Sequence, residues 1–254
     1  MLAREGAGNR LDGMEHERTV AGGKTGEGGR WRTLLHKGGT WNARVYRVED
    51  GEGRAWAEKD FSGCRWWVRW TLGRFLIWRE WWILRRLAGT GLVPGGVERA
   101  SATCLREDFC EGFALRDTLC GAYARNKRET SKWHGVEERM LREEIPASFF
   151  EELEAGVRAV HRAGFVHLDL HNARNVMVGP GFHPTVVDWQ SALPTFFLPR
   201  AVRRALERID LAGVWKFRAK FRPGELGEEE RQELEKSRQL HRYWFRRRGG
   251  SKRD

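Results

Sequence analysis

The 254-residue chain is long enough for one sizeable hydrophobic core, or for two small ones that share a cleft. Its 40% hydrophobic and 32% charged residues are typical of a folded protein and exclude a largely disordered one. The net charge of +11 predicts attraction to polyanions, namely nucleic acid, anionic lipid surfaces or phosphorylated substrates, without choosing among them.

Cysteine usage and apolar stretches indicate where the protein works. No CxxC pair occurs and no histidine lies at zinc-ligand spacing, so we expect reduced structural thiols in a cytoplasmic protein. The amino terminus is charged and contains no apolar stretch of a secretory signal. The longest apolar stretch, Phe75–Trp82, is interrupted by Arg79 and Glu80, so we expect no membrane span.

The first half of the chain changes from polar sequence to short strands and then to a helix. Residues 1–30, rich in Gly, Arg and Glu, predict a disordered extension. Two β-rich runs, 43–46 and 55–61, flank a turn-rich segment and predict a hairpin. Residues 66–87 have helical periodicity with interspersed arginines, and 102–109 is typical of another strand.

The second half is mainly helical. Ile145-Pro146 begins a predicted helix that runs to about Arg162 and ends at Gly164. Two short apolar runs follow at 176–178 and 185–187, separated by Gly-Pro-Gly. Strands first and helices later favour an α+β protein with a small β-rich lobe and a mainly helical lobe.

Two carboxylates in the second half carry the chemistry. A polar loop after the predicted helix presents Asp169 and Asn175, and the hairpin that follows ends at Asp188. Phosphoryl transfer needs a carboxylate near the acceptor hydroxyl and hard oxygen ligands for Mg²⁺ on the ATP phosphates. The spacing therefore predicts a phosphotransfer site in which Asp169 faces the acceptor while Asn175 and Asp188 hold the metal.

His167-Leu168-Asp169 with Asn175, followed by Asp188-Trp189-Gln190, resembles the catalytic loop and metal-binding motif of the protein-kinase-like superfamily. The resemblance covers about 31–222 and is greatest to the bacterial lipopolysaccharide core kinases, which phosphorylate heptose and Kdo, with the RIO kinases next. It implies a bilobal protein-kinase-like fold, a shortened activation segment, and ATP and Mg²⁺ as cofactors.

The same resemblance implies a nucleotide site in the first lobe. Lys59 matches the strand lysine that holds the ATP phosphates, and Glu80 on the next predicted helix is the candidate to orient it. Further residues expected near the nucleotide are Gly38, Gly39, Val45, Glu107 and Phe109. Gly38 and Gly39 stand where the phosphate loop belongs, but the third glycine of that pattern is missing and a plain β-turn is the alternative.

The sequence departs from protein kinases in ways that change the expected substrate. Asn172 is a rival metal ligand because Asp169 and Asn175 are one residue further apart than in typical protein kinases. Leu168 stands where many protein kinases have an arginine that binds the phosphate of a phosphorylated activation loop. Only about twenty residues separate Asp188 from Asp210, a candidate buried carboxylate that braces the catalytic loop. So short a segment favours a sugar or lipid-linked acceptor over an extended peptide.

His161 and His167 are expected to be structural, whereas His171 is left open between a contact with phosphate or acceptor and exposure to solvent.

Tryptophans and arginines alternate over 65–86, which allows three interpretations. The helix is an ordinary lobe helix, or a face that contacts an anionic membrane surface, or a nucleic-acid surface. No recognised nucleic-acid module accompanies it, so nucleic acid is the least favoured partner.

The expected domains are a disordered Gly-rich extension (1–30), a kinase N-lobe (31–111), a kinase C-lobe (112–225) and a helical basic tail (226–254). The predicted function is an ATP-dependent kinase that transfers the γ-phosphate of Mg-ATP to a hydroxyl of a lipopolysaccharide core sugar or another membrane-surface acceptor. The expected location is the cytoplasm, peripherally on the inner face of the cell membrane. Two alternatives stay open: a RIO-like serine/threonine protein kinase or ATPase, and a pseudokinase scaffold at the membrane surface.

Overall fold

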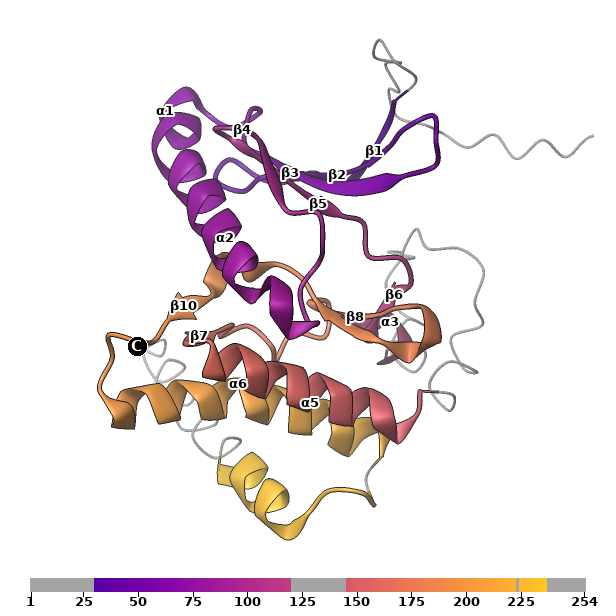
Figure 1. Cartoon of the computed structure of the whole chain (residues 1–254), viewed down its shortest axis with the longest axis vertical. Helices are drawn as coiled ribbons and strands as arrows, with labels where there is room; N and C mark the ends of the chain where they lie inside the picture. The colour runs from indigo at the N-terminus through magenta and orange to yellow at the C-terminus, as the bar shows by residue number, and fades with distance from the viewer. Residues whose placement is uncertain (1–29, 120–144, 223, 237–254) are drawn as a thin grey trace, which may run out of the picture.

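The computed structural model describes residues 30–119, 145–222 and 224–236. The first lobe is built on a five-stranded antiparallel sheet with the order β1-β2-β3-β5-β4 (Figure 1). Its strands are β1 (Trp31–His36), β2 (Arg44–Glu49), β3 (Ala55–Asp60), β4 (Glu98–Ser101) and β5 (Cys104–Asp108).

The β2–β3 hairpin is set by the turn between its strands. The Asp50 side chain accepts hydrogen bonds from the backbone N–H groups of Glu52 and Arg54. Gly53 has a φ of 80°, which glycine adopts without steric cost. The resulting register pairs Val45 with Lys59 and Arg44 with Asp60. Because strand side chains alternate, Lys59 faces one side of the sheet while Glu58 and Asp60 face the other.

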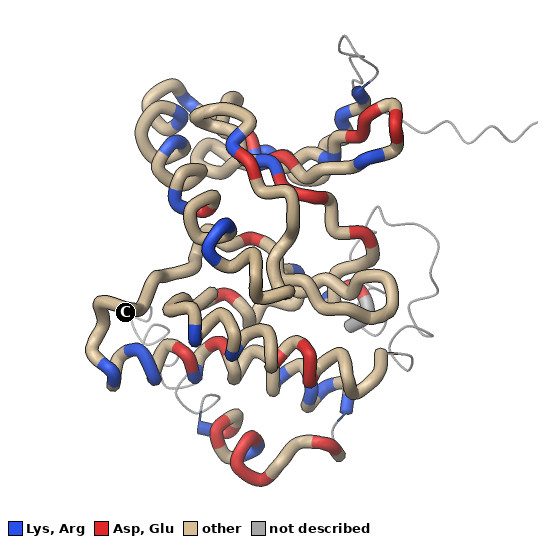
Figure 2. Tube along the Cα trace, in the orientation of Figure 1, with Lys and Arg blue, Asp and Glu red and all other residues tan. Residues whose placement is uncertain are grey.

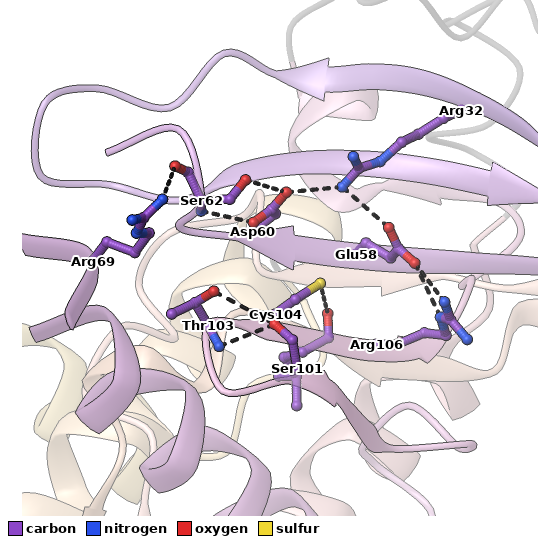
Figure 3. A network of polar contacts seen from close by, with 10 residues as sticks. Arg32, Glu58, Asp60, Ser62, Arg69, Ser101, Thr103, Cys104 and Arg106 are labelled. Atoms are coloured by element: carbon purple, nitrogen blue, oxygen red, sulfur yellow. Dashed lines mark hydrogen bonds and ion pairs between the residues drawn. The ribbon is translucent and has the colours of Figure 1, made fainter. Parts of the chain in front are cut away.

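The face opposite Lys59 carries a network of paired charges (Figure 3). Arg32 lies 3.1 Å from both Glu58 and Asp60, and Arg106 bridges Glu58 and Glu98. These pairs satisfy the two buried carboxylates of β3, Glu58 and Asp60, on the face opposite Lys59.

One continuous helix covers the sheet. It comprises α1 (Trp66–Val68), the π-helical turn η1 (Arg69–Gly73) and α2 (Arg74–Leu87). Its inner face buries Ile77, Ile83, Leu84 and Leu87 together with Glu80. A Cβ at Gly73 would fall 2.9 Å from Phe61, so this glycine allows the helix to approach the end of β3 closely.

The second lobe packs α5 (Ala147–Arg162) against α6 (Arg200–Phe221). Short strands lie between these helices and the first lobe (Figure 1). They are β6 (Phe113–Ala114), β8 (Val176–Val178) and β9 (Pro184–Val186) in one sheet, and β7 (Phe165–Val166) with β10 (Leu193–Pro194) in another. The remaining elements are α3 (Leu115–Leu119) and the 3₁₀ turns η2 (Ala88–Thr90), η5 (Pro180–Phe182) and η6 (Trp189–Ser191).

This arrangement is α+β and bilobal, as the sequence predicted, with only 189–199 between Asp188 and α6. The hairpin, the long helix of the first lobe, and α5 lie where they were expected. The edge strand β4 was not anticipated, because its sequence, Glu-Arg-Ala-Ser, is polar and exposed throughout.

Parts of the predicted organisation lie outside the described residues. They include 1–29 of the extension and the arginines at 246–248. The described part of the expected tail forms a helix over 228–236, and it carries more glutamates than basic residues. Within the described residues, no helix is both long and apolar enough to cross a membrane.

Candidate active site

Lys59 lies between two carboxylates that come from different lobes. Its Nζ is 2.5 Å from Oε1 of Glu80 on α2 and 3.0 Å from Oδ1 of Asp188, which follows β9. Glu80 is 1% exposed, whereas half of the Asp188 side chain is accessible. The three predicted residues therefore meet at the boundary between the lobes, with the open side of the cluster at Asp188.

Burial and charge shift the pKa values of this cluster. Burial alone lowers the pKa of Lys59, but the carboxylates of Glu80, Asp188 and Glu107 together raise it well above its usual value. The Lys59 ammonium group, in turn, lowers the pKa of Asp188. Burial raises the pKa of Glu80, and Lys59 offsets part of this effect. Lys59 is thus a permanent cation and Asp188 a permanent carboxylate, which suits a site for polyphosphate and metal.

The loop that carries Asp169 is anchored by a buried carboxylate on α6. Asp210 accepts 2.7 Å hydrogen bonds from the backbone N–H groups of His167 and Leu168, and its Oδ2 lies 3.2 Å from Nε2 of His161. These bonds hold Leu168 at a φ of 67°, which non-glycine residues rarely adopt. Asp210 therefore braces the loop as predicted, and His161 has the expected structural role.

Asp169 is joined to Asn175 across the loop. The Asn175 Nδ2 donates to Oδ2 of Asp169 at 2.8 Å and to its backbone oxygen at 3.1 Å. On the solvent side, Nε2 of His171 lies 3.4 Å from Oδ1 of Asp169. Asn172 instead accepts from the backbone of Arg174 through its side-chain oxygen. The structure thus brings Asp169, Asn175 and His171 together.

His167 connects the Asp169 loop to Asp188. Its Nδ1 accepts from the Asp169 N–H at 3.3 Å, and its Nε2 lies 3.2 Å from the backbone oxygen of Val187. Burial lowers the pKa of His167, so the ring is neutral and its Nε2–H donates to that oxygen. The ring also packs edge-on against Trp189 at 4.7 Å. The structural role predicted for His167 is confirmed, since its ring ties the backbone of Asp169 to that of Val187, the residue before Asp188.

Two adjacent residues of α2 hold the segment that follows Asp188. Oε1 of Glu80 accepts from the backbone N–H of Trp189 at 3.1 Å. The Arg79 guanidinium donates to the backbone oxygens of Gln190 and Ala192. In the sequence, Arg79 is only one of several helix arginines, because arginine-to-carbonyl contacts across the lobes leave no local signal. Arg79 is the positioning residue that sequence reasoning missed.

The structure places the residues expected at the nucleotide in different surroundings. Val45 pairs with Lys59 in the register of β2 and β3. The backbone N–H of Phe109 donates to the backbone oxygen of Ala55, so it is not available to hydrogen-bond a nucleotide. Glu107 is buried on β5, and burial raises its pKa to about 7. Its side chain, and not only its backbone, therefore borders the site.

The glycine loop is a tight turn. Gly38 has a φ of 63°, and a Cβ there would lie 2.6 Å from the backbone oxygens of Asn42 and Ala43. Its N–H donates to Nδ1 of His36, while the Gly39 N–H donates to the oxygen of Asn42. Both N–H groups already have partners, so phosphate could use them only after this loop rearranges.

The residues available to a metal fit Mg²⁺ in their chemistry. Mg²⁺ prefers one or two carboxylates with amide, phosphate and water oxygens. Asp188 supplies an ionised carboxylate that is half exposed, and Asn175 supplies an amide oxygen while its nitrogen is engaged by Asp169. Asp188 also has a left-handed backbone with a φ of 62°, a conformation concentrated at functional sites.

The chain matches no protein-family model, and no curated protein matches its sequence. Among solved structures it is similar to the crystal structure of the Rio2 kinase–ADP/Mg²⁺–phosphoaspartate complex from Chaetomium thermophilum. The sequence identity is 15% and the TM-score is 0.48, over 76% of this chain and 58% of that chain. The chain thus spans less than two thirds of that structure, and a similarity of this extent carries no information on activity or substrate.

Proposed function

We propose that the protein is an ATP-dependent phosphotransferase whose site lies between the two lobes. The observation that carries this proposal is the position of Lys59, which contacts Glu80 on its own lobe and Asp188 on the other. A structural ion pair would need only one carboxylate. A lysine held between a buried and a half-exposed carboxylate can keep its partner Glu80 and exchange Asp188 for phosphate oxygens.

Each residue of the site has a distinct task in this proposal. Lys59 binds the phosphates of ATP, and Glu80 fixes its orientation. Asn175 and Asp188 would hold Mg²⁺, which neutralises charge on the phosphate oxygens when bound. Asp169 accepts a hydrogen bond from the acceptor hydroxyl and so positions it. The loose transition state of phosphoryl transfer requires little early proton abstraction, so positioning and charge neutralisation dominate.

The proposed acceptor is a hydroxyl group at a membrane surface, such as a sugar of a lipopolysaccharide core. Only 189–199 separate the Asp188 motif from α6, which leaves little platform for an extended peptide. Exposed aromatic side chains on the helix and on this segment support an acceptor held near lipid, namely Trp70, Phe75, Trp78, Phe196 and Phe197. In this proposal the enzyme binds the inner face of the membrane peripherally.

The activity is tested by following transfer of the γ-phosphate from Mg-ATP to candidate acceptors by mass spectrometry. Asp169→Asn and Lys59→Met should each reduce transfer at least about a hundredfold, because each removes on the order of 3 kcal/mol of transition-state stabilisation. Matched controls are Glu152→Gln and Lys236→Met, which lose a charge at exposed positions away from the site.

Near wild-type turnover by a folded Asp169→Asn or Lys59→Met protein would show that the assigned role is wrong. ATP binding without transfer to any sugar, lipid-linked or protein acceptor would instead favour a scaffold.

A further inference from the structure

A cationic cavity lies at a corner of the first lobe, between the turn after β1 and the connection from β3 to α1. Its volume is about 360 Å³, and Lys37, Arg44 and Arg65 line it together with Gly39 and Thr40. Lys59, Glu80 and Asp188 do not line this cavity. Nothing in the proposed phosphotransfer reaction uses its three cations.

The cavity is distinct from the Lys59 cluster, because Arg44 and Lys59 lie on opposite faces of the sheet. Arg44 pairs with Asp60 in the β2–β3 register, whereas its neighbour Val45 pairs with Lys59. A Cβ at Gly63 would fall 2.7 Å from Cζ of Arg44. The absence of a side chain at Gly63 thus lets the guanidinium lie against the backbone, which fixes it at the cavity wall.

Among the described residues, no carboxylate forms an ion pair with the three cations of the cavity. No acidic residue occurs in 37–44 or in 61–79. Asp60, the cross-strand neighbour of Arg44, is already bound by Arg32 and Ser62 (Figure 3). Arginine binds phosphate oxygens well, since its planar donors match them in pairs. The chemistry of the cavity is that of a phosphate site.

Exposed tryptophans surround this cavity on both chain segments that form it. Trp41, between two lining residues, is 54% exposed, and its ring packs edge-on against Trp67 at 4.7 Å. Trp66, next to Arg65, is 73% exposed and Trp70 is 50% exposed. Several solvent-exposed tryptophans close together are typical of a protein surface that contacts the headgroup layer of a membrane.

We propose that this corner is a lipid headgroup site, in which the cavity binds the phosphate of an anionic membrane lipid while Trp41, Trp66 and Trp70 enter the headgroup layer. The proposal extends the membrane-surface part of the proposed function and involves no catalytic residue. Arginines continue along η1 and α2, as the blue positions of Figure 2 show, so further cations follow the cavity on the same helix. A soluble phosphate compound would not require the exposed indole rings, and for this reason we assign the site to lipid.

The test is co-sedimentation with vesicles of phosphatidylcholine, with or without about one fifth phosphatidylglycerol. The variant Lys37→Gln/Arg44→Gln/Arg65→Gln should bind anionic vesicles on the order of a hundredfold more weakly than wild type, at about fivefold for each cation. The matched control is Arg200→Gln/Arg204→Gln/Arg208→Gln on α6, which has the same net charge and should bind like wild type. Equal weakening of both variants would show diffuse attraction and overturn the proposal.

The tryptophans are tested at high salt, where charge attraction is screened. Trp66→Ala/Trp70→Ala should lose the binding that salt leaves in wild type, and unchanged high-salt binding would contradict the proposal. Soluble glycerol 3-phosphate and a short single-stranded oligonucleotide are added as competitors. The proposal is wrong if either binds more tightly than vesicles and depends on the same three cations.

Mg-ATP stabilisation, measured by thermal unfolding, separates this site from the proposed kinase activity. The cavity variant should retain the wild-type stabilisation by Mg-ATP while losing vesicle binding. If wild type shows no Mg-ATP stabilisation, the kinase proposal fails and the vesicle result still decides the cavity. Should the triple variant not fold, the single change Arg65→Gln at an exposed position should weaken vesicle binding about fivefold, and unchanged binding would overturn the proposal.

Discussion

The carboxyl group of Glu107 is buried beside the cation of Lys59, yet its pKa is raised rather than lowered. Burial is the largest cause, and the carboxylates of Glu80 and Asp188 add to it while Lys59 opposes it. The pKa of about 7 means that the folded protein holds a proton that the unfolded chain releases near 4.5. Stability should therefore fall as pH rises from about 5 to 7, because the folded state binds more protons over that window.

Glu107→Gln should remove this dependence. At pH 8 the variant should be more stable than wild type by on the order of 1–3 kcal/mol, and at pH 5 the two should be nearly equal. Urea denaturation at both pH values measures the difference. Glu98→Gln, an exposed change on β4, is the control and should not show this pH-dependent gain. A constant difference between Glu107→Gln and wild type from pH 5 to 8 would contradict the pKa.

Most residues of the candidate site could be predicted from the sequence, because each is a polar or charged residue at a recognisable position along the chain. Asp169, Asn175 and Asp188 stand out as polar residues at the ends of apolar runs, and Lys59 follows a strand pattern. Arg79 and the side chain of Glu107 could not be assigned in this way. Their neighbours come from segments that are distant in sequence. No local sequence pattern predicts the strand pairing and lobe packing that bring them together.

At the scale of elements, α6 approaches the catalytic loop so closely that one position on it has no room for a side chain. A Cβ at Gly213 would lie 2.9 Å from the backbone carbon of Leu170 and 3.0 Å from the nitrogen of His171. Both atoms are backbone, so the loop would have to move as a whole. Asp169, which precedes them, would move with it.

Gly213→Ala should destabilise the protein by about 1–3 kcal/mol and reduce phosphoryl transfer, since overpacking displaces the loop. Urea denaturation and the transfer assay measure the two effects. Gly89→Ala is the control, because a Cβ there meets no atom within 4 Å, and it should leave both quantities near wild type. A stable, fully active Gly213→Ala protein would show that the contact between α6 and the loop is loose.

The elements themselves were predicted well where periodicity or turn chemistry is strong. Pro146 and Gly164 bound α5 in sequence as they do in the structure. Strand β4 was missed because an exposed edge strand has neither an apolar face nor alternation to reveal it. The length of α6 was also not anticipated, since Arg200–Phe221 is polar over its first half and only its second half is buried.

At the scale of the whole molecule, the proposed nucleotide site joins the two lobes. Lys59 belongs to the sheet lobe, whereas Asp188 and Asn175 belong to the helical lobe. A ligand that contacts both groups should stabilise the lobes together, because it binds the folded state alone. If Asp188 is a metal ligand, the nucleotide contacts the helical lobe through Mg²⁺, and its stabilising effect should depend on the metal.

Mg-ATP should therefore raise the Tm of wild type, whereas Asp188→Ala should lose the part of this rise that depends on metal. The measurement is a thermal-shift titration with ATP in the presence of Mg²⁺ or of a chelator. Glu152→Ala is the control, since it removes an exposed carboxylate of α5 that pairs with His183. Equal Mg-ATP stabilisation of wild type and Asp188→Ala would reject the assignment.

The contact of one Glu80 oxygen with both Lys59 and the Trp189 N–H has a consequence for solvent exchange. Deuterium can replace the proton of the Trp189 amide only when that hydrogen bond opens. The same oxygen orients Lys59, so an opening in which Glu80 moves away with α2 frees the amide and releases the lysine together. The exchange rate of this single amide thus sets an upper limit on how often α2 leaves the site, and it can be measured without substrate.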